Sequence, residues 1–528
     1  MTAPAALAEL PARFNMAEYC IGRAAREHPA RTALLVFNFP NPKNDGDAVE
    51  AWGFIDVERA VLQFSAAFGQ LGLKRGDRVA IRLGNSSRSA LLFFGAIAGG
   101  YVALPLSEQL TANELRALLE DSGAAIIATS EPLDAEAVPN GVRILSAEDV
   151  EDLFWDPDSG HYCGTAVTYA DTKADDPAFL IYTSGTTARP KGVLHAHRSA
   201  WGRRPMYQGW YGITPDDRVL HAGSFNWTYT LGVGLTDPWA NGATSIVYTG
   251  KKSPEIWPGL IAKTGTTLFA AVPGVYRQIL KYARPRPGDF GGLRHGLVAG
   301  ETPPAGLFED WERATGRPLY EALGMSEIST YISTAPNVPR RPGAIGKAQA
   351  GRRVAILPYV GGTEPLPAGA EGLIGVHRSD LGLMLGYWNR PDEEREVFRG
   401  DWFTGGDIGA MDTGGYISHL GRANELMNAG GHRVSPLEVE AVLSQAPGVA
   451  EVACAEIAVG GGVRVIAAFV VGVPGVPVSP DAILGFAAER LAAYKCPKLI
   501  RVVDAIPRTA NGKVQRRALA NIEAVSLE

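Results

Sequence analysis

Up to about residue 175, short apolar runs alternate with alanine-rich stretches of helical periodicity. The pattern predicts strands at residues 78–83 and 101–104, a helix at 90–98 between them, and one more strand at 125–128. Strands that alternate with helices form βαβ units, which build a largely parallel sheet. We therefore expect an α/β fold, and we interpret this first third of the chain as scaffold because no chemical motif occurs in it.

The last hundred residues have a different pattern. The pattern of residues 463–470 predicts a strand, and residues 481–493 have the spacing of an amphipathic helix. The chain after this helix reaches Pro497, which stops it. We expect a small α+β unit here. A chain of 528 residues also exceeds what one hydrophobic core normally supports, so two or more domains are expected.

Composition is that of a globular protein, with 46% hydrophobic and 20% charged residues. The longest apolar run, residues 90–106, is nearly long enough to cross a bilayer, but Gly95, Gly99, Gly100 and Pro105 interrupt it. We therefore expect a buried helix and strand there, and no integral membrane segment. The N-terminus lacks a basic segment followed by an apolar core, so no secretory signal is expected.

Net charge and cysteine content bear on the kind of partner and on the cell compartment. A net charge of −6 and a pI near 5.9 argue against nucleic acid as a partner. The four cysteines have neither a disulfide framework nor a metal-binding spacing, so we expect reduced thiols in a cytoplasmic protein; they are Cys20, Cys163, Cys454 and Cys496. The sequence leaves the oligomeric state open, with a homodimer among the options.

A strand predicted at residues 178–181 leads into a polar loop at 182–192, which reads Tyr-Thr-Ser-Gly-Thr-Thr-Ala-Arg-Pro-Lys-Gly. Glycine lets several amide groups converge on one anion, the hydroxyls add donors, and Lys191 adds a positive charge. The alternative is a solvated turn rich in Ser, Thr and Gly. We predict a phosphate cradle made by Thr183, Ser184, Gly185, Thr186, Thr187 and Lys191.

The cradle differs from the two commonest nucleotide motifs. Six residues separate Gly185 from Gly192, and Pro190 precedes the lysine where the helix of a Walker A motif should begin. No Gly-x-Gly-x-x-Gly follows a strand, which disfavours a dinucleotide-binding fold. The loop instead resembles the phosphate signature of the adenylate-forming superfamily, which contains acyl- and aryl-CoA ligases, luciferases and peptide-synthetase adenylation domains.

The resemblance covers essentially the whole chain. It implies an α/β multidomain protein with a large N-terminal domain of packed α/β subdomains, a small mobile α+β C-terminal domain, and an active site between them. We place the N-terminal AMP-binding domain at residues 1–420, a hinge at 421–427 and the C-terminal lid domain at 428–528.

The same resemblance implies the nucleotide site. Glu327 matches the acid of the family motif Tyr-Gly-x-Thr-Glu and would hold Mg²⁺, which prefers oxygen ligands. Asp407 would bind the ribose hydroxyls, Arg422 would contact the nucleotide, and Lys513 matches the family's catalytic lysine. The other residues expected to contact ATP are Gly300, Glu301, Thr302, Leu323, Gly324 and Ser326.

Other matched positions concern coenzyme A and the hinge. Gly431 and Arg433 match residues near the family's thiol tunnel, and Asn424 stands at the hinge position, where aspartate or lysine is more common. Asparagine tolerates unusual φ and ψ angles, so a pivot is feasible there. The chain departs from the family pattern at Asn424 and at four further positions: Ala188 replaces glycine, Leu323 replaces tyrosine, Ser326 replaces threonine and Gly405 replaces threonine.

Residues 223–232 concentrate aromatic side chains beside glycine. An aromatic cluster is more often core than ligand pocket, but the family has acyl-pocket residues in this region. We therefore predict that Phe225, Trp227 and Tyr229 line the pocket for the acid. Large rings would shorten it and favour benzoate-like or short-to-medium acyl groups.

His195 and His197 also stand out, but metal binding is the minority interpretation. Two histidines at i and i+2 fall on different sides of a helix, and no third ligand is near in sequence. By the resemblance, His197 is structural.

Taken together, the resemblance implies an ATP-dependent carboxylate–CoA ligase that uses ATP, Mg²⁺ and coenzyme A and acts on a small carboxylic acid. Lys513, Glu327 and Lys191 are the expected catalytic residues. Two alternatives stay open: an adenylate-forming enzyme with another acceptor, and a nucleotide-binding protein without catalysis.

Overall fold

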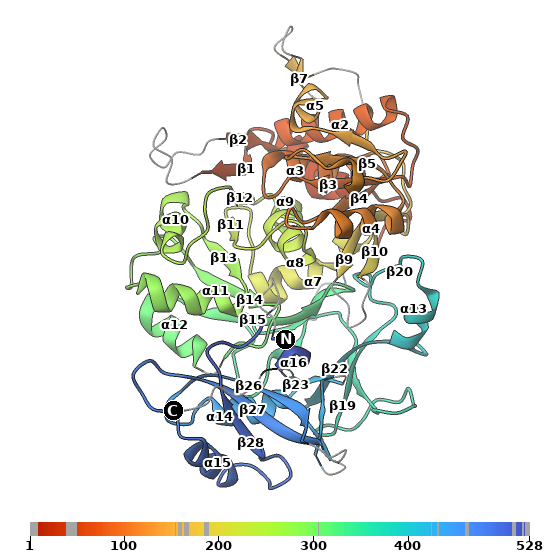
Figure 1. Cartoon of the computed structure of the whole chain (residues 1–528). Helices are drawn as coiled ribbons and strands as arrows, with labels where there is room; N and C mark the ends of the chain where they lie inside the picture. Colours follow the sequence, from red (N-terminus) through yellow and green to blue (C-terminus); the bar gives the residue numbers. More distant parts are fainter. Residues whose placement is uncertain are drawn as a thin grey trace.

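The computed structural model describes residues 9–38, 50–153, 155–156, 161–162, 168–183, 190–304, 306–423, 425–429, 432–459, 464–508, 514–519 and 522. Within these ranges no helix is long and apolar enough to span a membrane. Figure 1 shows the N-terminal elements at one end and the blue C-terminal elements at the other.

The first part of the chain forms the predicted βαβ arrangement. Strand β3 (Arg78–Arg82) pairs in parallel with β4 (Val102–Pro105) on one side and with β5 (Ala124–Thr129) on the other. Helix α3 (Ser87–Ala98) connects β3 to β4, and Ser86 caps it by accepting a hydrogen bond from the Ser89 amide. All of α3 except Arg88 is buried, which confirms that this apolar run belongs to the core.

The predicted loop region joins two strands of the same sheet. Strand β9 (Pro177–Thr183) pairs antiparallel with β10 (Lys191–Ala196), and the short β20 (Gly386–Tyr387) pairs with β10 on its other side. Among the described residues the sheet order is β20-β10-β9-β4-β3-β5-β6, where β6 is Arg143–Leu145. Lys191 therefore begins a strand, in agreement with the absence of a Walker A helix.

The largest sheet is mixed. Its parallel half is flanked by α10 (Ile256–Thr264), α11 (Pro273–Gln278) and α12 (Leu307–Thr315) in Figure 1. In sheet order this half contains β1 (Thr32–Phe37), β12 (Thr244–Tyr248), β11 (Arg218–His221), β13 (Leu268–Ala271), β14 (His295–Ala299) and β15 (Leu319–Met325). Antiparallel strands continue it through β16 (Ser329–Ser333), β17 (Gly346–Ala348), β23 (Tyr416–Arg422), β22 (Trp402–Met411), β19 (Glu371–His377) and β18 (Val354–Leu357).

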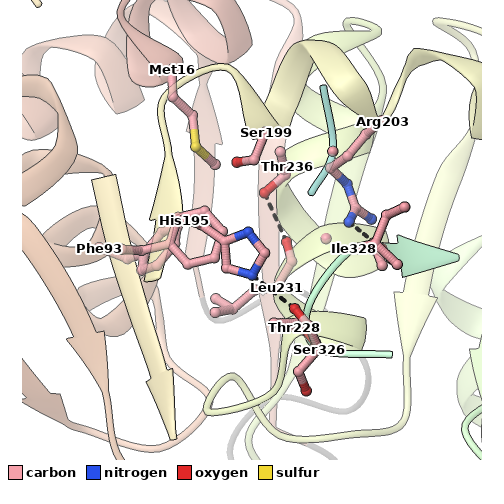
Figure 2. Close-up of a pocket in the computed structure, with 14 residues that line it drawn as sticks. Met16, Phe93, His195, Ser199, Arg203, Thr228, Leu231, Thr236, Ser326 and Ile328 are labelled. Atoms are coloured by element: carbon pink, nitrogen blue, oxygen red, sulfur yellow. Dashed lines mark hydrogen bonds between the residues drawn. The ribbon is translucent and has the colours of Figure 1, made fainter. Parts of the chain in front are cut away.

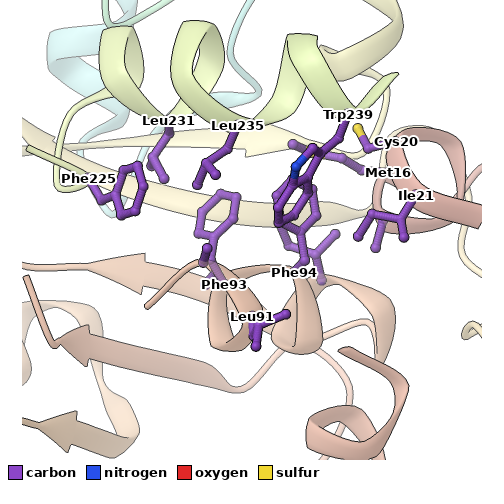
Figure 3. Packing of buried hydrophobic residues seen from close by; sticks show 14 of the residues in the cluster. Met16, Cys20, Ile21, Leu91, Phe93, Phe94, Phe225, Leu231, Leu235 and Trp239 are labelled. Atoms are coloured by element: carbon purple, nitrogen blue, oxygen red, sulfur yellow. The ribbon is translucent and has the colours of Figure 1, made fainter. Parts of the chain in front are cut away.

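The main core lies between the two sheets (Figure 3). Phe93 and Phe94 of α3 meet residues of the segment that contains α8 (Thr228–Leu231) and α9 (Asp237–Ala240). The rings of Phe94 and Trp239 lie 4.9 Å apart, and the Trp239 indole donates to the carbonyl of Ala33. This packing fixes the helical segment against α3.

The C-terminal part is the expected α+β unit. Strands β26 (Val449–Ala458), β27 (Arg464–Gly472) and β28 (Leu499–Val502) form a sheet, with α14 (Pro436–Leu443), α15 (Pro480–Ala488) and α16 (Arg516–Leu519) around it. The predicted strand at 463–470 is confirmed by β27. The predicted helix at 481–493 was too long, because α15 ends at Ala488, well before Pro497.

An ion pair joins the small domain to the large one. Arg277 of α11 lies 3.1 Å from Glu451 of β26, and Arg508 donates to the same carboxylate at 3.2 Å. Arg508 immediately precedes residues 509–513, so the segment leading to Lys513 starts at this interdomain contact.

Candidate active site

The matched motifs lie at the ends of neighbouring strands. Gly300 directly follows β14 with a φ of +96°, a conformation that favours glycine, and Leu323 and Gly324 lie in β15. A Cβ at Gly324 would lie 2.6 Å from the carbonyl oxygen of Ser329, so only glycine allows this approach of β15 to β16. Glu327 lies in the turn between these two strands, and no helix follows Ser326.

Tyr387 links two motifs that are far apart in sequence. Its hydroxyl donates to Oε1 of Glu327 at 2.8 Å, and the ammonium group of Lys191 lies 5.2 Å from the centre of its ring. The amide of Met384, just before β20, donates to the Glu327 carbonyl at 2.7 Å. The structure therefore brings Lys191 and Glu327 to one aromatic side chain, with Glu327 at its hydroxyl and Lys191 over its ring.

Lys191 also forms an ion pair with Glu393 of α13 (Pro391–Val397). Both side chains are largely shielded, at 17% and 27% exposure, so the pair is screened less than a surface pair. Thr183 is the register partner of Lys191 across the β9–β10 pair. The other predicted cradle residues, Ser184, Gly185, Thr186 and Thr187, lie outside the described residues.

Asp407 and Arg422 face each other across β22 and β23 as register partners. Asp407 is 2% exposed, and its Oδ1 lies 3.4 Å from Nε of Arg422 and 2.9 Å from Nε2 of His419. The Asp407 charge raises the pKa of Arg422, and Glu327 adds to the shift. The charge of Arg422 thus interacts with both carboxylates, which indicates that the Asp407 and Glu327 motifs belong to the same site.

One departure from the family pattern has a local cause. A Cβ at Gly405 would lie 2.3 Å from the sulfur of Met325. The methionine of β15 therefore occupies the space that a threonine side chain at position 405 would need.

Two of the aromatic side chains predicted to line an acid pocket pack into the core. Phe225 is 5% exposed, and the Tyr229 hydroxyl donates to the carbonyl of Leu297 at 3.2 Å while its ring lies 4.3 Å from that of His221. Trp227 is partly exposed. Their role toward an acid stays a prediction.

A small cavity lies beside this segment (Figure 2). Its volume is about 30 Å³. It is lined in part by Thr228, Leu231, Gly232, Ser326, Arg203 and His195.

The two histidines are held separately. His195 lies in β10 and bonds through Nε2 to the carbonyl of Ser326 at 2.8 Å, whereas Nδ1 of His197 accepts from the amide of Met16 at 3.0 Å. His195 is in a strand, so the helical geometry considered from the sequence does not apply. Within the described residues no group of three or more His, Cys, Asp or Glu side chains could hold a metal ion.

Several predicted residues are not placed. Asn424, Gly431 and Lys513 lie outside the described residues, and for Arg433 only the backbone in β25 (His432–Val434) is described. The segment after Lys513 is anchored in the small domain, because Arg516 pairs with Glu440 and lies 3.5 Å from Glu425.

Sequence reasoning missed Tyr387, Glu393 and His419. Tyr387 is brought to the site by the pairing of β20 with β10, and His419 by the pairing of β23 with β22. No local motif marks these pairings. The one available signal was the position of Glu393 in the acidic run that begins α13.

Comparisons with known proteins show the family. The family model "AMP-binding enzyme" matches residues 21–388, and "AMP-binding enzyme C-terminal domain" matches residues 438–513. The 3-hydroxybenzoate–CoA ligase of Aromatoleum sp. (strain CIB) is 30% identical over 486 residues, which cover 88% of this chain and 91% of that protein.

Solved structures are also similar. ATP-bound MatB from Rhodopseudomonas palustris has a TM-score of 0.86 and 26% identity, covering 96% of this chain and 98% of that one. A benzoate CoA ligase from Burkholderia xenovorans LB400 has a TM-score of 0.83 and 25% identity, covering 96% and 100%.

Proposed function

Because this chain belongs to the AMP-binding enzyme family, we propose that it is an ATP-dependent carboxylate–CoA ligase that forms an acyl-adenylate and then an acyl-CoA thioester. The observation that carries the proposal is the Tyr387 link. It joins Lys191 and Glu327 beside the Asp407–Arg422 pair, although 135 residues separate the two in the sequence.

The first half-reaction brings two anions together. A carboxylate oxygen attacks the α-phosphorus of ATP, the bond to the bridging oxygen breaks, and pyrophosphate leaves. Fixed positive charge is needed to stabilise this step. Lys191 and the amides of residues 184–187 would hold the departing pyrophosphate, and Lys513 would bridge the acid and the α-phosphate.

Glu327 fits a role as magnesium ligand. Tyr387 donates to Oε1, and among the described residues no side chain or amide donates to Oε2. A carboxylate oriented by one bond and open at its other oxygen suits a hard cation. Bound Mg²⁺ would neutralise phosphate charge.

The nucleoside is assigned to the other side of the site. Asp407 would accept hydrogen bonds from the ribose hydroxyls, with His419 and Arg422 orienting the carboxylate. Gly300, Glu301, Thr302, Leu323, Gly324 and Ser326 would surround the base and the start of the phosphate chain.

In the second half-reaction the thiolate of coenzyme A attacks the adenylate carbonyl and AMP leaves. Gly431 and Arg433 would line the approach of the thiol. The segment with Lys513 would have to withdraw, with Asn424 as the pivot.

The acid is proposed to be benzoate-like or of short to medium chain length. Two relatives support an aromatic acid, since their names specify 3-hydroxybenzoate and benzoate. Phe225 is buried in this segment, and large rings lining the pocket would shorten it and disfavour a long chain.

The test is incubation with ATP, Mg²⁺, coenzyme A and a set of aryl, branched and linear acids. We expect acyl-CoA by mass spectrometry and acid-dependent exchange of labelled pyrophosphate into ATP. Exchange without thioester would indicate another acceptor. No exchange with any acid would indicate a nucleotide-binding protein without catalysis.

A further inference from the structure

The cavity shown in Figure 2 contains polar groups that the nucleotide chemistry does not use. Phe93, Phe179 and Leu231 form apolar walls, while His195, Ser199 and Arg203 supply polar atoms. A volume of about 30 Å³ admits one hydroxyl or amino group, or one or two water molecules, but no aromatic ring.

His195 presents a hydrogen-bond acceptor here. Its Nε2 lies 2.8 Å from the carbonyl oxygen of Ser326, and since a carbonyl only accepts, Nε2 must carry a hydrogen. Burial lowers the pKa of His195 to about 4, so the ring is neutral at pH 7 and Nδ1 keeps its lone pair. The ring is fixed by stacking on Phe179, with the ring centres 4.6 Å apart.

Both Nδ1 of His195 and the hydroxyl of Ser199 are buried without a hydrogen-bond partner among the described residues. The two residues are 3% and 5% exposed. Figure 2 shows the second ring nitrogen of His195 on the side of the ring toward Ser199. A buried polar atom without a hydrogen-bond partner destabilises the fold, so a partner is expected in the cavity.

Arg203 does not make the cavity attractive to an anion. Its guanidinium forms two hydrogen bonds to Asp237, at 2.7 and 2.6 Å, and a third to Ser329 at 2.5 Å. Tyr211 donates to the same carboxylate at 2.6 Å. The arginine charge is therefore cancelled inside the protein.

The cavity lies next to the residues of the proposed reaction. Ser326 lines it and immediately precedes Glu327, and Thr228 lines it and immediately follows Trp227. For an acid bound at the proposed site, a group at its far end would lie at this cavity while the ring stays outside.

We propose that this cavity binds a hydrogen-bond donor of the acid substrate. Nδ1 of His195 accepts from a hydroxyl or amino group, and Ser199 is its second partner. The inference rests on the proposed function and narrows it: the substrate is a hydroxy- or amino-substituted acid. A second carboxylate is disfavoured, because its lone pairs would face that of Nδ1 and no uncompensated cation offsets them.

The test compares kcat/KM in pyrophosphate release for benzoate, its hydroxy and amino derivatives, and its carboxy derivatives. We expect the best hydroxy- or amino-substituted benzoate to exceed benzoate by about 10-fold or more, because benzoate would leave the buried acceptor unpaired. The dicarboxylates should fall below benzoate. His195→Phe keeps a ring on Phe179 and removes the acceptor, so it should bring the hydroxyl-to-benzoate ratio close to one.

His295→Gln is the matched control. His295 is equally buried and bonds to the carbonyl of Tyr211 at 2.8 Å, but it does not line the cavity, so its exchange should keep the ratio. Ser199→Ala gives a second measurement if His195→Phe fails to fold, and it should lower the ratio.

The outcomes separate the two proposals. Turnover of several acids with a ratio near one in the wild type, or a preference for dicarboxylates, would overturn this inference alone and leave a cavity that holds water. Absence of pyrophosphate release with every acid would overturn the proposed function as well.

Discussion

The hydroxyl of Tyr387 donates a 2.8 Å hydrogen bond to Oε1 of Glu327. Burial and the Glu327 charge raise the pKa of Tyr387, so the phenol stays protonated and keeps donating. Because the same ring lies under Lys191, one side chain orients the proposed magnesium ligand and supports the proposed phosphate ligand.

Tyr387→Phe should therefore weaken metal binding more than folding. A hydrogen bond to a charged group contributes about 1.5–3 kcal/mol, so we expect pyrophosphate release to need at least about 10-fold more Mg²⁺. The measurement is the Mg²⁺ titration of the rate. Tyr416→Phe is the control, since its hydroxyl donates to the carbonyl of Pro339 outside the site; equal shifts in both variants would contradict the assignment.

Glu393→Gln should increase the affinity for ATP. Glu393 pairs with Lys191 in the structure, so phosphate must compete with this carboxylate. Removing its charge should lower the KM for ATP by about 2- to 10-fold, the range of a partly shielded ion pair. Glu394→Gln, on the same helix, should leave KM unchanged. An increased KM in Glu393→Gln would show that the carboxylate assists nucleotide binding instead.

Lys513→Ala should abolish adenylate formation and spare thioester formation from synthetic acyl-adenylate. One oriented charged donor contributes about 10²–10³ in rate. Gly431→Leu should do the reverse, because bulk there would obstruct coenzyme A. The two half-reactions are assayed separately; equal loss of both in either variant would exclude separate roles.

Gly232→Ala should destabilise the large domain. A Cβ at position 232 would lie 2.0 Å from Nη2 of Arg203, which is held by its buried pair with Asp237. Disrupting a buried pair costs about 3–5 kcal/mol, which urea unfolding can measure. Gly259→Ala in α10 is the control: nothing lies within 4 Å of its added Cβ, so stability should be unchanged or slightly higher.

Acid should destabilise the protein through buried histidines. Burial lowers the pKa of His195, His197 and His295 to about 4, against 6.5 when exposed. Between pH 6.5 and 4 the unfolded chain binds more protons, so each histidine removes about 1.4 kcal/mol of stability per pH unit on acidification. Glu321, whose pKa burial raises to about 8, opposes part of this loss because its folded form is already protonated.

His295→Gln removes the contribution of one buried histidine to this loss of stability in acid. Its stability deficit relative to the wild type should shrink as pH falls from 6.5 toward 4, as measured by urea unfolding at several pH values. The exposed His28 provides the control, and His28→Gln should parallel the wild type. A deficit that stays constant with pH would contradict the buried neutral state of His295.

The elements that local pattern specifies were predicted well. The β3, α3, β4 and β5 order follows from periodicity and glycine positions. The family resemblance singled out Lys191, Glu327, Asp407 and Arg422, whose roles stay predictions. The predicted end of α15 was wrong: the helix ends at Ala488 with Glu489 as its C-cap, and turns separate it from Pro497.

The remaining features depend on long-range pairing. Tyr387 reaches Glu327 only because β20 joins β10, and His195 gains its role only because its carbonyl partner, Ser326, comes from a turn far along the chain. The aromatic segment has the same limit: its ring content does not separate core from ligand pocket, and only the packing shows that Phe225 is buried in the main core.

The contact of Arg203 with Gly232 and Asp237 has an evolutionary consequence. A neutral residue at 203 would strand a carboxylate in the interior, a neutral residue at 237 would uncover a cation, and a side chain at 232 would displace the guanidinium. In homologous sequences these three positions should therefore change together. In a lineage that loses only Asp237, the uncovered Arg203 charge should favour acids with a second negative charge.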